Sequence, residues 1–428
     1  MKRMLVIGAV ATAAAFLFTG CTPTASVDPN ATPAITIWVD ATREGPATAY
    51  ADSVKGKVDV TVEVRDTNNL VADIALANKA DSGWPDLVFG GQPNAIAQLR
   101  DPANGFAAPL DDLLSSDFLG GFGAANGVCE YDGATYCVKN DLAQTVLWYD
   151  TKIFSDLGLT VPTTFDEFAT TAETLAAAGY VSGALGANAL YAGFFESSGC
   201  TFTDLDAKSN TVVVNPKADE CQRVVDLVQP LVDAGALDTR SPFDAGFVAD
   251  VAQKGKVAMQ IGPSWFGDFV YTPTDSWAVP AGTTSAAAMP AWGSDKAYSG
   301  QWGGGIWAVS SHSDYKQAAA DALQWMLTDE TAVASGPTFP AYGPSAAVWG
   351  AKTSANPFYA DDIIPVFEAQ AALVNPKTKG VLYDIDTALN ANLSTLVTNG
   401  SSIQDALTSF AENVTNLAKE SGYTVATK

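Results

Sequence analysis

The sequence is poor in the residues that metal sites and many enzymes depend on. Its 428 residues include a single histidine, His312, and only five cysteines. It contains no Cys-x-x-Cys pair, no His-Glu-x-x-His segment and no Gly-x-Ser-x-Gly segment. One histidine cannot build a histidine-rich zinc site and leaves a serine hydrolase a single candidate base. We therefore expect no metal, no cofactor and no serine-histidine chemistry, and we place His312 in a surface loop.

Basic residues are also scarce. The chain has 23 Lys and Arg against 47 Asp and Glu, which gives a formal net charge of −24 at pH 7. Nucleic-acid binding requires clustered Lys and Arg, so the composition argues against nucleic acid as a partner. An anionic substrate steered by a positive field is disfavoured for the same reason. A neutral or weakly charged ligand suits this charge, although acidity that only keeps an exported protein soluble explains it equally well.

Long apolar runs are absent after residue 18. Residues 2–3 are basic, residues 4–18 are almost entirely apolar, and Thr-Gly-Cys follows at 19–21. This is the layout of a secretory signal, and it is too short for a spanning helix. The small residues before Cys21 resemble the lipobox of bacterial lipoproteins, with Phe18 where Leu, Val or Ile is usual. We expect a lipidated Cys21 at the outer face of the membrane, with a plain secretory signal cut nearby as the alternative.

The rest of the chain is long and apolar enough for two folded domains. Hydrophobic residues make up 47% of the sequence, which excludes global disorder. Residues 22–33 are rich in Thr, Pro, Ser, Ala and Asn, a composition typical of a flexible linker. We predict that this segment tethers a globular body to the membrane.

Four cysteines remain once Cys21 is set aside, and an even number in an exported protein indicates two disulfides. Cys129 and Cys137 flank an Asp-Gly turn signal at 132–133. A three-residue loop at 132–134 sets these two cysteines opposite each other, whereas a two-residue loop does not. We predict a Cys129–Cys137 bridge and infer the three-residue loop from it.

The second bridge, Cys200–Cys221, follows by elimination. A metal site is the competing explanation for the four thiols, and the absence of Cys-x-x-Cys pairs disfavours it.

Short apolar strands alternate with helical patterns along the chain, which predicts an α/β fold with a parallel sheet. The expected strands are 34–39, 58–65, 85–89, 143–149, 257–261 and 306–309. One expected helix follows the first strand and ends near residue 55. Further helices are expected at 69–80, 164–178 and 315–327, in a stretch that begins at 215, and over most of the chain after 384. A capping box at Thr164 and Glu167 starts one helix, and Pro230 should kink or shorten another. The last helical region should break at Gly400 and restart at Ser401 or Ser402.

Several blocks in order resemble the extracellular solute-binding proteins of family 1, the carbohydrate receptors of ABC importers. The blocks are 131–133, 138–141, 146–150, 157–168, Gly-Lys-Val-Ala-Met at 255–259 with Gly-Pro-Ser-Trp at 262–265, 303–310 and 319–330. The resemblance implies two α/β lobes around a ligand cleft, which closes by hinge motion. Lobe 1 would comprise 34–140 and 280–335, and lobe 2 would comprise 141–279 and 336–428. It also implies a monomer that binds without catalysis and hands a carbohydrate to ABC permease subunits.

Sugars present flat apolar faces and rings of hydroxyls, so aromatic, carboxylate, amide and guanidinium groups recognise them. In α/β lobes such groups collect in loops beyond strand ends, and the family pattern marks the loop after the first strand, the first crossing and a stacking tryptophan after Gly-Pro. The candidates are Trp38, Asp40, Arg43, Glu44, Gln92, Asn94, Asp141, Gln144, Tyr191, Phe195, Glu196, Trp265, Trp302, Gly303, Gly304 and Tyr342. Phe194, Trp292 and Gln301 are further candidates.

Two other classes of function remain open. The same fold could bind iron, phosphate or a polyamine, and an exported glycoside hydrolase could also have a cleft with aromatic side chains and paired carboxylates. Several aromatic platforms favour an oligosaccharide over a monosaccharide. The sequence therefore predicts a membrane-tethered receptor that closes on a sugar.

Overall fold

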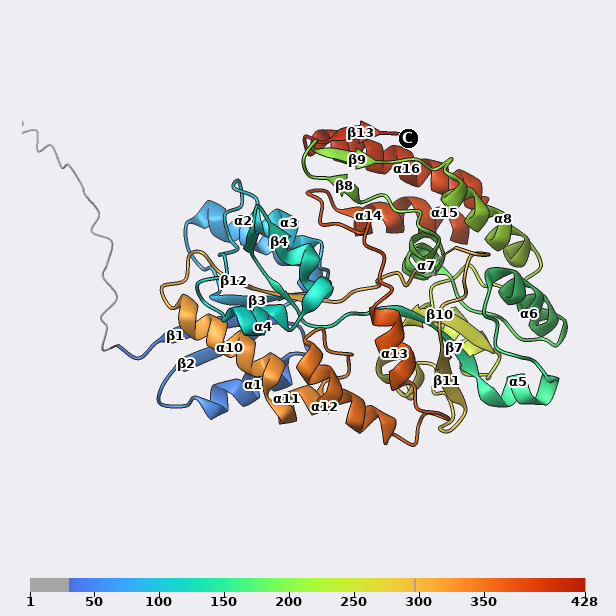
Figure 1. The fold of residues 1–428 in the computed structure, drawn as a ribbon, viewed down its shortest axis with the longest axis horizontal. Helices are drawn as coiled ribbons and strands as arrows, with labels where there is room; N and C mark the ends of the chain where they lie inside the picture. The colour runs from blue at the N-terminus through green and yellow to red at the C-terminus, as the bar shows by residue number, and fades with distance from the viewer. Residues whose placement is uncertain (1–30, 296–297, 428) are drawn as a thin grey trace, which may run out of the picture.

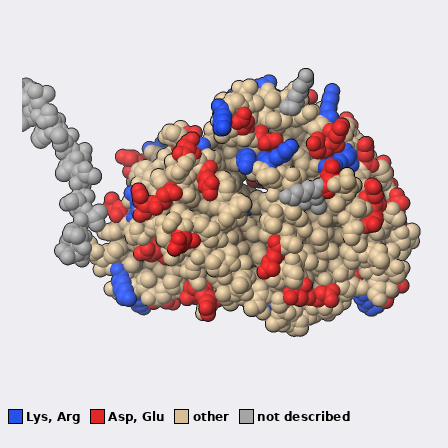
Figure 2. Space-filling model, viewed as in Figure 1, with Lys and Arg blue, Asp and Glu red and all other residues tan. Residues whose placement is uncertain are grey.

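The protein is a two-lobed α/β molecule, seen here in a computed structural model that describes residues 31–295 and 298–427 (Figure 1). The predicted signal peptide, Cys21 and residues 22–30 of the predicted tether lie outside the described residues. Within the described ranges no helix is long and apolar enough to cross a membrane. Asp and Glu side chains are spread over both lobes on the face shown in Figure 2, and Lys and Arg occupy fewer places.

Lobe 1 is built on a five-stranded mixed sheet. Its strand order is β2 (Asp59–Val64), β1 (Ala34–Val39), β3 (Leu87–Gly90), β12 (Ile306–Val309) and β6 (Val138–Lys139). β1 runs parallel to β2 and β3, whereas β12 runs antiparallel to β3 and β6. The predicted parallel pairing therefore holds for the first three strands, and the strand that returns from lobe 2 is reversed. Its helices include α1 (Glu44–Ser53), α2 (Leu70–Ala80), α3 (Ala95–Arg100), α4 (Ser116–Gly120) and α10 (Lys316–Thr328).

Lobe 2 contains two small sheets and most of the helices at the right of Figure 1. One sheet has the order β10 (Met259–Pro263), β7 (Thr145–Asp150), β11 (Thr284–Ala287) and is antiparallel. The other has the order β13 (Thr424–Ala426), β9 (Thr211–Val213), β8 (Asp204–Asp206). The longer helices of this lobe are α5 (Thr151–Leu157), α6 (Phe165–Ala177), α8 (Asp219–Asp233) and α16 (Ile403–Glu420). An apolar core joins these helices to β7 and β10.

The remaining helical segments complete the chain. In the N-terminal half they are η1 (Thr67–Asn69), η2 (Gly123–Cys129), α7 (Gly186–Leu190) and η3 (Tyr191–Glu196). In the middle they are α9 (Ala245–Phe247), η4 (Val248–Ala252) and η5 (Gly267–Tyr271). The C-terminal part has α11 (Glu330–Ser335), α12 (Gly343–Ser354), α13 (Ile364–Ala371), α14 (Ile385–Ala388), η6 (Leu389–Ser394) and α15 (Thr395–Thr398).

The helix boundaries follow local capping chemistry. The Thr164 hydroxyl accepts the Glu167 N–H while the Glu167 carboxylate accepts the Thr164 N–H, so the predicted capping box is confirmed. The break at Gly400 is also confirmed, because the glycine has φ +88° and Ser402 caps α16. Pro230 was expected to kink or shorten its helix. Shortening is wrong, because α8 continues past Pro230 to Asp233, and the kink stays a prediction. The apolar face of α8, which includes Val228 and Leu231, is buried on both sides of the proline, and this packing holds the last turn.

Three chain segments that cross between the lobes lie side by side beneath the space between them. Backbone bridges join Asp141 to Pro340 and Gln144 to Gln301. Ala143 lies between Asp141 and Gln144 and has φ +48°, an uncommon conformation for a residue with a Cβ. Such a bundle of crossings is the natural place for a hinge, because a few residues there can absorb a change in lobe orientation.

Both predicted disulfides are present, but the hairpin register differs from the one inferred. Cys129 is bonded to Cys137 and Cys200 to Cys221, each with Cα atoms 5.0 Å apart. The strands β4 (Glu130–Tyr131) and β5 (Ala134–Thr135) are joined by a two-residue turn at 132–133, not by a three-residue loop. The inference failed because a bridge spanning a diagonal pair of positions is also within reach.

Two segments lie apart from the lobes to which the sequence assigned them. β11 pairs with β7, so residues 284–287 belong to the lobe 2 sheet although 280–335 was assigned to lobe 1. Helix α12 packs against α10 and α11 on the side of lobe 1, although residues after 335 were assigned to lobe 2. The assigned boundaries near 280 and 335 therefore do not match the packing of these two segments.

Candidate functional site

Two adjoining cavities lie where the lobes meet, above the crossing segments. The larger has a volume of about 260 Å³ and the smaller about 70 Å³. Gln92, Trp302 and Gly303 line both cavities, so the two are neighbouring parts of one cleft. The larger is lined by Asp40, Thr42, Arg43, Phe89, Gly91, Gln92, Asp141, Trp265, Phe269, Trp302, Gly303, Gly304, Gly305 and Thr338.

Strand ends bring the walls of the larger cavity together. Asp40 follows β1 directly, Gly91 and Gln92 follow β3, and Trp265 follows β10. β1 and β3 are parallel neighbours, so their carboxyl ends open at one edge of the lobe 1 sheet. β10 contributes its end from the other lobe. The cavity therefore has one wall from each lobe, which is the arrangement a closing cleft needs.

A charged cluster forms the lobe 1 side of the larger cavity. The Arg43 guanidinium lies 3.0 Å from an Asp40 carboxylate oxygen and 3.3 Å from one of Asp141. It also stacks over the Phe89 ring, with the guanidinium carbon 4.2 Å from the ring centroid. Asp141 accepts a second hydrogen bond, of 2.9 Å, from the Asn140 amide. Fixed carboxylate and guanidinium groups of this kind can bridge pairs of ligand hydroxyls.

An aromatic wall faces this cluster from lobe 2. Trp265 and Trp302 pack edge to face, with ring centroids 5.5 Å apart and planes at 71°. The Trp265 indole N–H donates a 2.9 Å hydrogen bond to the Trp302 carbonyl, which fixes the orientation of its ring. Trp265 remains partly exposed, and Phe269 extends the wall below it. A flat apolar surface that is already held in place can stack against a sugar face.

A glycine turn closes the floor between the two walls. Gly303 and Gly304 have φ +89° and +86°, which residues with a Cβ rarely adopt. A Cβ on Gly304 would come 3.0 Å from both the Asp141 carbonyl and the Lys139 ammonium nitrogen. The turn therefore needs glycine for its conformation and for its close approach to the crossing segment.

The smaller cavity is acidic and deeply set. Its walls are Gln92, Pro93, Asn94, Asn188, Tyr191, Ala192, Glu196, Thr203, Gln301, Trp302, Gly303, Thr378, Lys379, Ile385, Asp386 and Leu389. Burial raises the pKa of the Glu196 carboxyl to about 7, although hydrogen bonds from the Gln301 N–H at 2.9 Å and the Thr378 hydroxyl at 3.1 Å oppose the shift. Burial also raises the pKa of Asp386 to about 6. The hydroxyl of Thr203 is buried and has no hydrogen-bond partner among the described residues.

Lys139 is a buried cation behind the glycine turn. Its side chain is fully buried, and its ammonium nitrogen has no hydrogen-bond partner among the described residues. Burial lowers the pKa of Lys139 to about 8, while the carboxylates of Asp141 and Glu196 oppose this shift. Lys139 therefore adds positive charge between the acidic groups of the two cavities.

Eleven of the sixteen candidate residues line one or both cavities of the cleft. Asp40, Arg43, Asp141, Trp265 and Gly304 line the larger cavity only, and Gln92, Trp302 and Gly303 line both. Asn94, Tyr191 and Glu196 line the smaller cavity, as does the further candidate Gln301.

Five listed candidates line neither cavity. Trp38 is buried under Arg65, whose guanidinium carbon is 4.6 Å from its ring, and Glu44 is exposed at the start of α1. Gln144 is buried, and its amide donates to the Phe367 carbonyl. Phe195 is buried in the lobe 2 core, and Tyr342 packs on Phe118 and Phe122.

The further aromatic candidates and His312 occupy other places. Phe194 and Trp292 are core residues that pack with Phe165. His312 is exposed and stacks on Trp84 with ring centroids 3.9 Å apart, which confirms its surface position.

The sequence missed several lining residues. Phe89, Thr42 and Gly91 sit in the same strand-end loops as predicted candidates, so the strand-end rule could have found them. Asn188, Thr203, Thr378 and Asp386 come from segments that only the tertiary fold brings together, and no local pattern marks them.

A third cavity, of about 250 Å³, lies elsewhere in lobe 2. It is walled by Trp148, Tyr271 and Trp277 among others and shares no lining residue with the cleft. It opens beside β7 and β10 rather than between the lobes, and none of the predicted ligand-binding residues lines it.

Comparison with solved structures shows the same fold in several bacterial binding proteins. The galacto-N-biose- and lacto-N-biose I-binding protein of an ABC transporter from Bifidobacterium longum matches with a TM-score of 0.76 at 20% identity, over 93% of this chain and 100% of that one. A binding protein from Bifidobacterium animalis subsp. lactis, solved with β-1,6-galactobiose, matches with 0.71 at 20% identity over 92% and 100%.

A third structure is the cyclic α-maltosyl-1,6-maltose binding protein of Arthrobacter globiformis, with a TM-score of 0.69 at 18% identity over 91% of this chain and 100% of that one. A comparison with curated protein sequences gives no significant match. The model of the bacterial extracellular solute-binding protein family matches residues 40–333, which include strand ends from both lobes, the crossing at Asp141 and both tryptophans of the cleft. The chain therefore belongs to the bacterial extracellular solute-binding protein family.

Proposed function

We propose that this protein is the sugar receptor of an ABC importer. In this proposal it captures an oligosaccharide in the cleft between its lobes and delivers it intact to the permease. It acts outside the cytoplasm as a monomer, held at the membrane by a lipid on Cys21. The larger cavity carries the proposal, because it opposes the fixed Trp265 and Trp302 rings to the Arg43–Asp141 pair. Stacking surfaces opposite hydroxyl-bridging charges are the combination that sugars require.

The ligand would act by shifting the population of lobe orientations. A sugar that touches Asp40 and Arg43 on one lobe and Trp265 on the other stabilises the orientation in which both are in reach. Asn94 offers a protein contact of the same kind. Its amide donates to the Tyr383 carbonyl at 3.2 Å and accepts from the Val381 N–H at 2.8 Å, which links the loop after β3 to the C-terminal segment. We propose that this pair of bonds holds the closed form.

Phosphate, iron and a polyamine suit the cleft less well than a sugar. Phosphate in the larger cavity would need a free cation there, but Arg43, the basic residue of that lining, is already paired with two carboxylates. Iron would need clustered ligands, and within residues 31–295 and 298–427 no group of three His, Cys, Asp or Glu side chains is placed to hold a metal ion. A polyamine would suit Glu196 and Asp386 but would make less use of the two tryptophans.

The test is a thermal-shift screen of the protein lacking residues 1–21. The panel contains mono- and oligosaccharides of several linkages, with iron, phosphate, amino acids and polyamines. A ligand that binds only the folded state raises the melting temperature according to its saturation. We expect a shift with one glycan series, and recovery of the glycan unchanged after incubation. A shift with only an ion or an amine would contradict the sugar proposal, and a hydrolysed glycan would contradict the receptor proposal.

A further inference from the structure

One aromatic side chain stands exposed beside the cleft. Among the described residues four large hydrophobic side chains are exposed, and Phe243 is the aromatic one, with 51% of its surface open to solvent. It does not line either cavity of the cleft. A single exposed apolar side chain is common and needs no explanation by itself, so what matters is what surrounds the ring of Phe243.

Phe243 continues the aromatic wall of the larger cavity outward. Its ring is nearly parallel to that of Trp265, with planes at 13° and centroids 6.3 Å apart. It also meets Trp302 edge to face, with centroids 6.0 Å apart. Trp265 and Trp302 both line the larger cavity, so the row of rings runs from inside the cavity to the surface.

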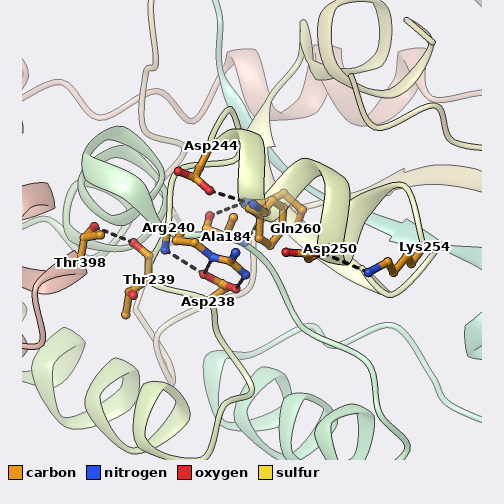
Figure 3. Close-up of polar contacts among 10 residues, drawn as sticks. Ala184, Asp238, Thr239, Arg240, Asp244, Asp250, Lys254, Gln260 and Thr398 are labelled. Carbon is orange, nitrogen blue, oxygen red and sulfur yellow. Dashed lines mark hydrogen bonds and ion pairs between the residues drawn. The ribbon is translucent and has the colours of Figure 1, made fainter. Parts of the chain in front are cut away.

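The loop that carries Phe243 is fixed on its N-terminal side. Figure 3 shows Arg240 folded back on Asp238, with guanidinium-to-carboxylate distances of 2.9 and 2.6 Å. The carbonyl of Thr239 accepts a 3.2 Å hydrogen bond from the Thr398 hydroxyl, which ties the loop to α15. The backbone of Asp238 is paired with the segment around Ala184.

The loop is equally fixed on its C-terminal side. The Asp244 carboxylate accepts the Phe247 N–H at 2.8 Å and so caps α9. The Trp277 indole N–H donates to the Pro242 carbonyl at 2.9 Å. These bonds hold the backbone on both sides of Phe243, and a ligand that used its ring would lose little free energy in ordering the loop.

We propose that Phe243 is the platform for a sugar unit that extends beyond the larger cavity. This inference rests on the proposed function and deepens it, because it assigns the ligand a length: an oligosaccharide with at least one unit outside the space bounded by Trp265. The unit stacks its apolar face on the exposed face of Phe243 while the preceding units occupy the cavity. Phe243 thus selects longer chains over shorter ones of the same linkage.

The test compares chain lengths rather than single affinities. Isothermal titration calorimetry is run with maltose, laminaribiose, cellobiose and β-1,6-galactobiose, and with the tri- and tetrasaccharides of the same series. Wild type is compared with Phe243→Ala, with Phe243→Trp, which keeps a flat ring, and with Leu76→Ala, which removes another exposed apolar side chain in α2. Melting temperatures without glycan report whether each variant is folded.

In wild type the tri- or tetrasaccharide of the bound series should bind more tightly than its disaccharide. Phe243→Ala should lower affinity for the longer glycan by roughly tenfold, as expected for a lost aromatic stacking contact, and change that for the disaccharide by less than about twofold. Phe243→Trp should restore the preference, and Leu76→Ala should leave it unchanged.

Two results overturn the inference while the proposed function stands. One is a disaccharide that binds as tightly as its longer homologues in wild type. The other is a preference for length that survives in Phe243→Ala. If no glycan of any length binds, the proposed function itself is wrong and the inference is wrong with it.

Discussion

The two cavities of the cleft are neighbours that share three lining residues, yet they are built in opposite ways. The larger has aromatic walls, partly exposed rings and charges that already form ion pairs. The smaller contains two carboxyl groups whose pKa values are raised by burial, and a buried hydroxyl that has no hydrogen-bond partner in the part of the chain that the structure describes. One cavity is thus suited to stacking a flat ligand face, and the other holds carboxyl groups that titrate closer to neutral pH than usual.

This contrast teaches how much each part of the cleft depends on the rest of the fold. The larger cavity rests on strand ends, which the sheet fixes directly. The smaller one depends on η3, α14 and the segment near Thr378, which meet only when the C-terminal part packs on lobe 2. Changes in lobe 2 packing should therefore disturb the smaller cavity first.

The largest expected effect on stability near the smaller cavity comes from removing the Cys200–Cys221 disulfide. Cys200 lies between Glu196 and Thr203, two residues of the smaller cavity wall. Replacing both cysteines by serine opens a loop with a sequence separation of 21 and should lower the free energy of unfolding by about 3 kcal/mol. Denaturant unfolding followed by circular dichroism measures this change.

The matched control is the Cys129–Cys137 pair, with a sequence separation of 8 and no residue in either cavity. Its removal should cost slightly less, because a shorter loop restricts the unfolded chain less. A larger loss from this pair than from Cys200–Cys221 would contradict the argument from loop length.

The next effect separates stacking from packing. Trp265→Ala should weaken glycan binding by about 2 kcal/mol, because it removes the fixed ring of the larger cavity, and should change the melting temperature little. Trp292→Ala is the comparison, because Trp292 stacks on Phe165 in the core with centroids 4.0 Å apart and lines neither cavity. It should lower the melting temperature and leave affinity nearly unchanged. The reverse pattern would mean that the aromatic wall is structural.

The carboxyl groups of the smaller cavity should make the free energy of unfolding depend on pH. Burial raises the pKa of Glu196 to about 7, so the folded protein holds a proton that the unfolded chain releases at lower pH. For a raised carboxyl pKa, stability is greatest at low pH and falls as the pH rises through the folded value. Between pH 6 and pH 7 the free energy of unfolding should fall by about 1 kcal/mol from this group.

Glu196→Gln should remove most of that slope, and Glu44→Gln, at an exposed position, should leave it intact. Asp386 contributes in the same direction at lower pH, because its pKa is raised to about 6. The measurement is urea unfolding at several pH values up to 7, where Lys139 stays mostly charged although burial lowers its pKa to about 8. If the free energy of unfolding of Glu196→Gln varied with pH as in the wild type, Glu196 would not be the source of this pH dependence.

The same contrast explains what the sequence could predict. Asp40, Gln92 and Trp265 follow strands whose apolar runs are visible in the sequence. The parallel strands β1 and β3 open at a common edge, which brings Asp40 and Gln92 together, and the family pattern marked Trp265 after Gly-Pro. Trp38 and Phe195 were misplaced because an aromatic residue near a strand or helix end carries no mark of which face it occupies. Trp38 turned toward Arg65, and Phe195 turned into the core.

The rest of the site lies beyond local patterns. Asp386 and Thr203 are far apart in sequence and meet Gln92 of lobe 1 only in the folded cleft. The predicted hairpin register was wrong for a related reason. A disulfide restricts the distance between two cysteines, but it does not determine which residues of the two strands pair. Family resemblance implied the two lobes, but only tertiary pairing placed β11 and α12.

The smallest expected effect tests the charged side of the larger cavity. Asp141→Asn keeps the shape of the side chain but removes the charge that Arg43 meets at 3.3 Å. Arg43 keeps Asp40 at 3.0 Å, so the protein should remain folded while affinity for a neutral glycan falls by about 1 kcal/mol, from a weakened charge-assisted hydrogen bond. Asp40→Asn is the comparison, and calorimetry with the glycan found in the screen is the measurement. Because Asp40 is the more exposed partner, with 26% of its side chain open against 3% for Asp141, its replacement should cost less. Equal losses would mean that the two carboxylates serve the ligand alike. No loss in either variant would leave the aromatic wall as the only ligand-binding side of the larger cavity.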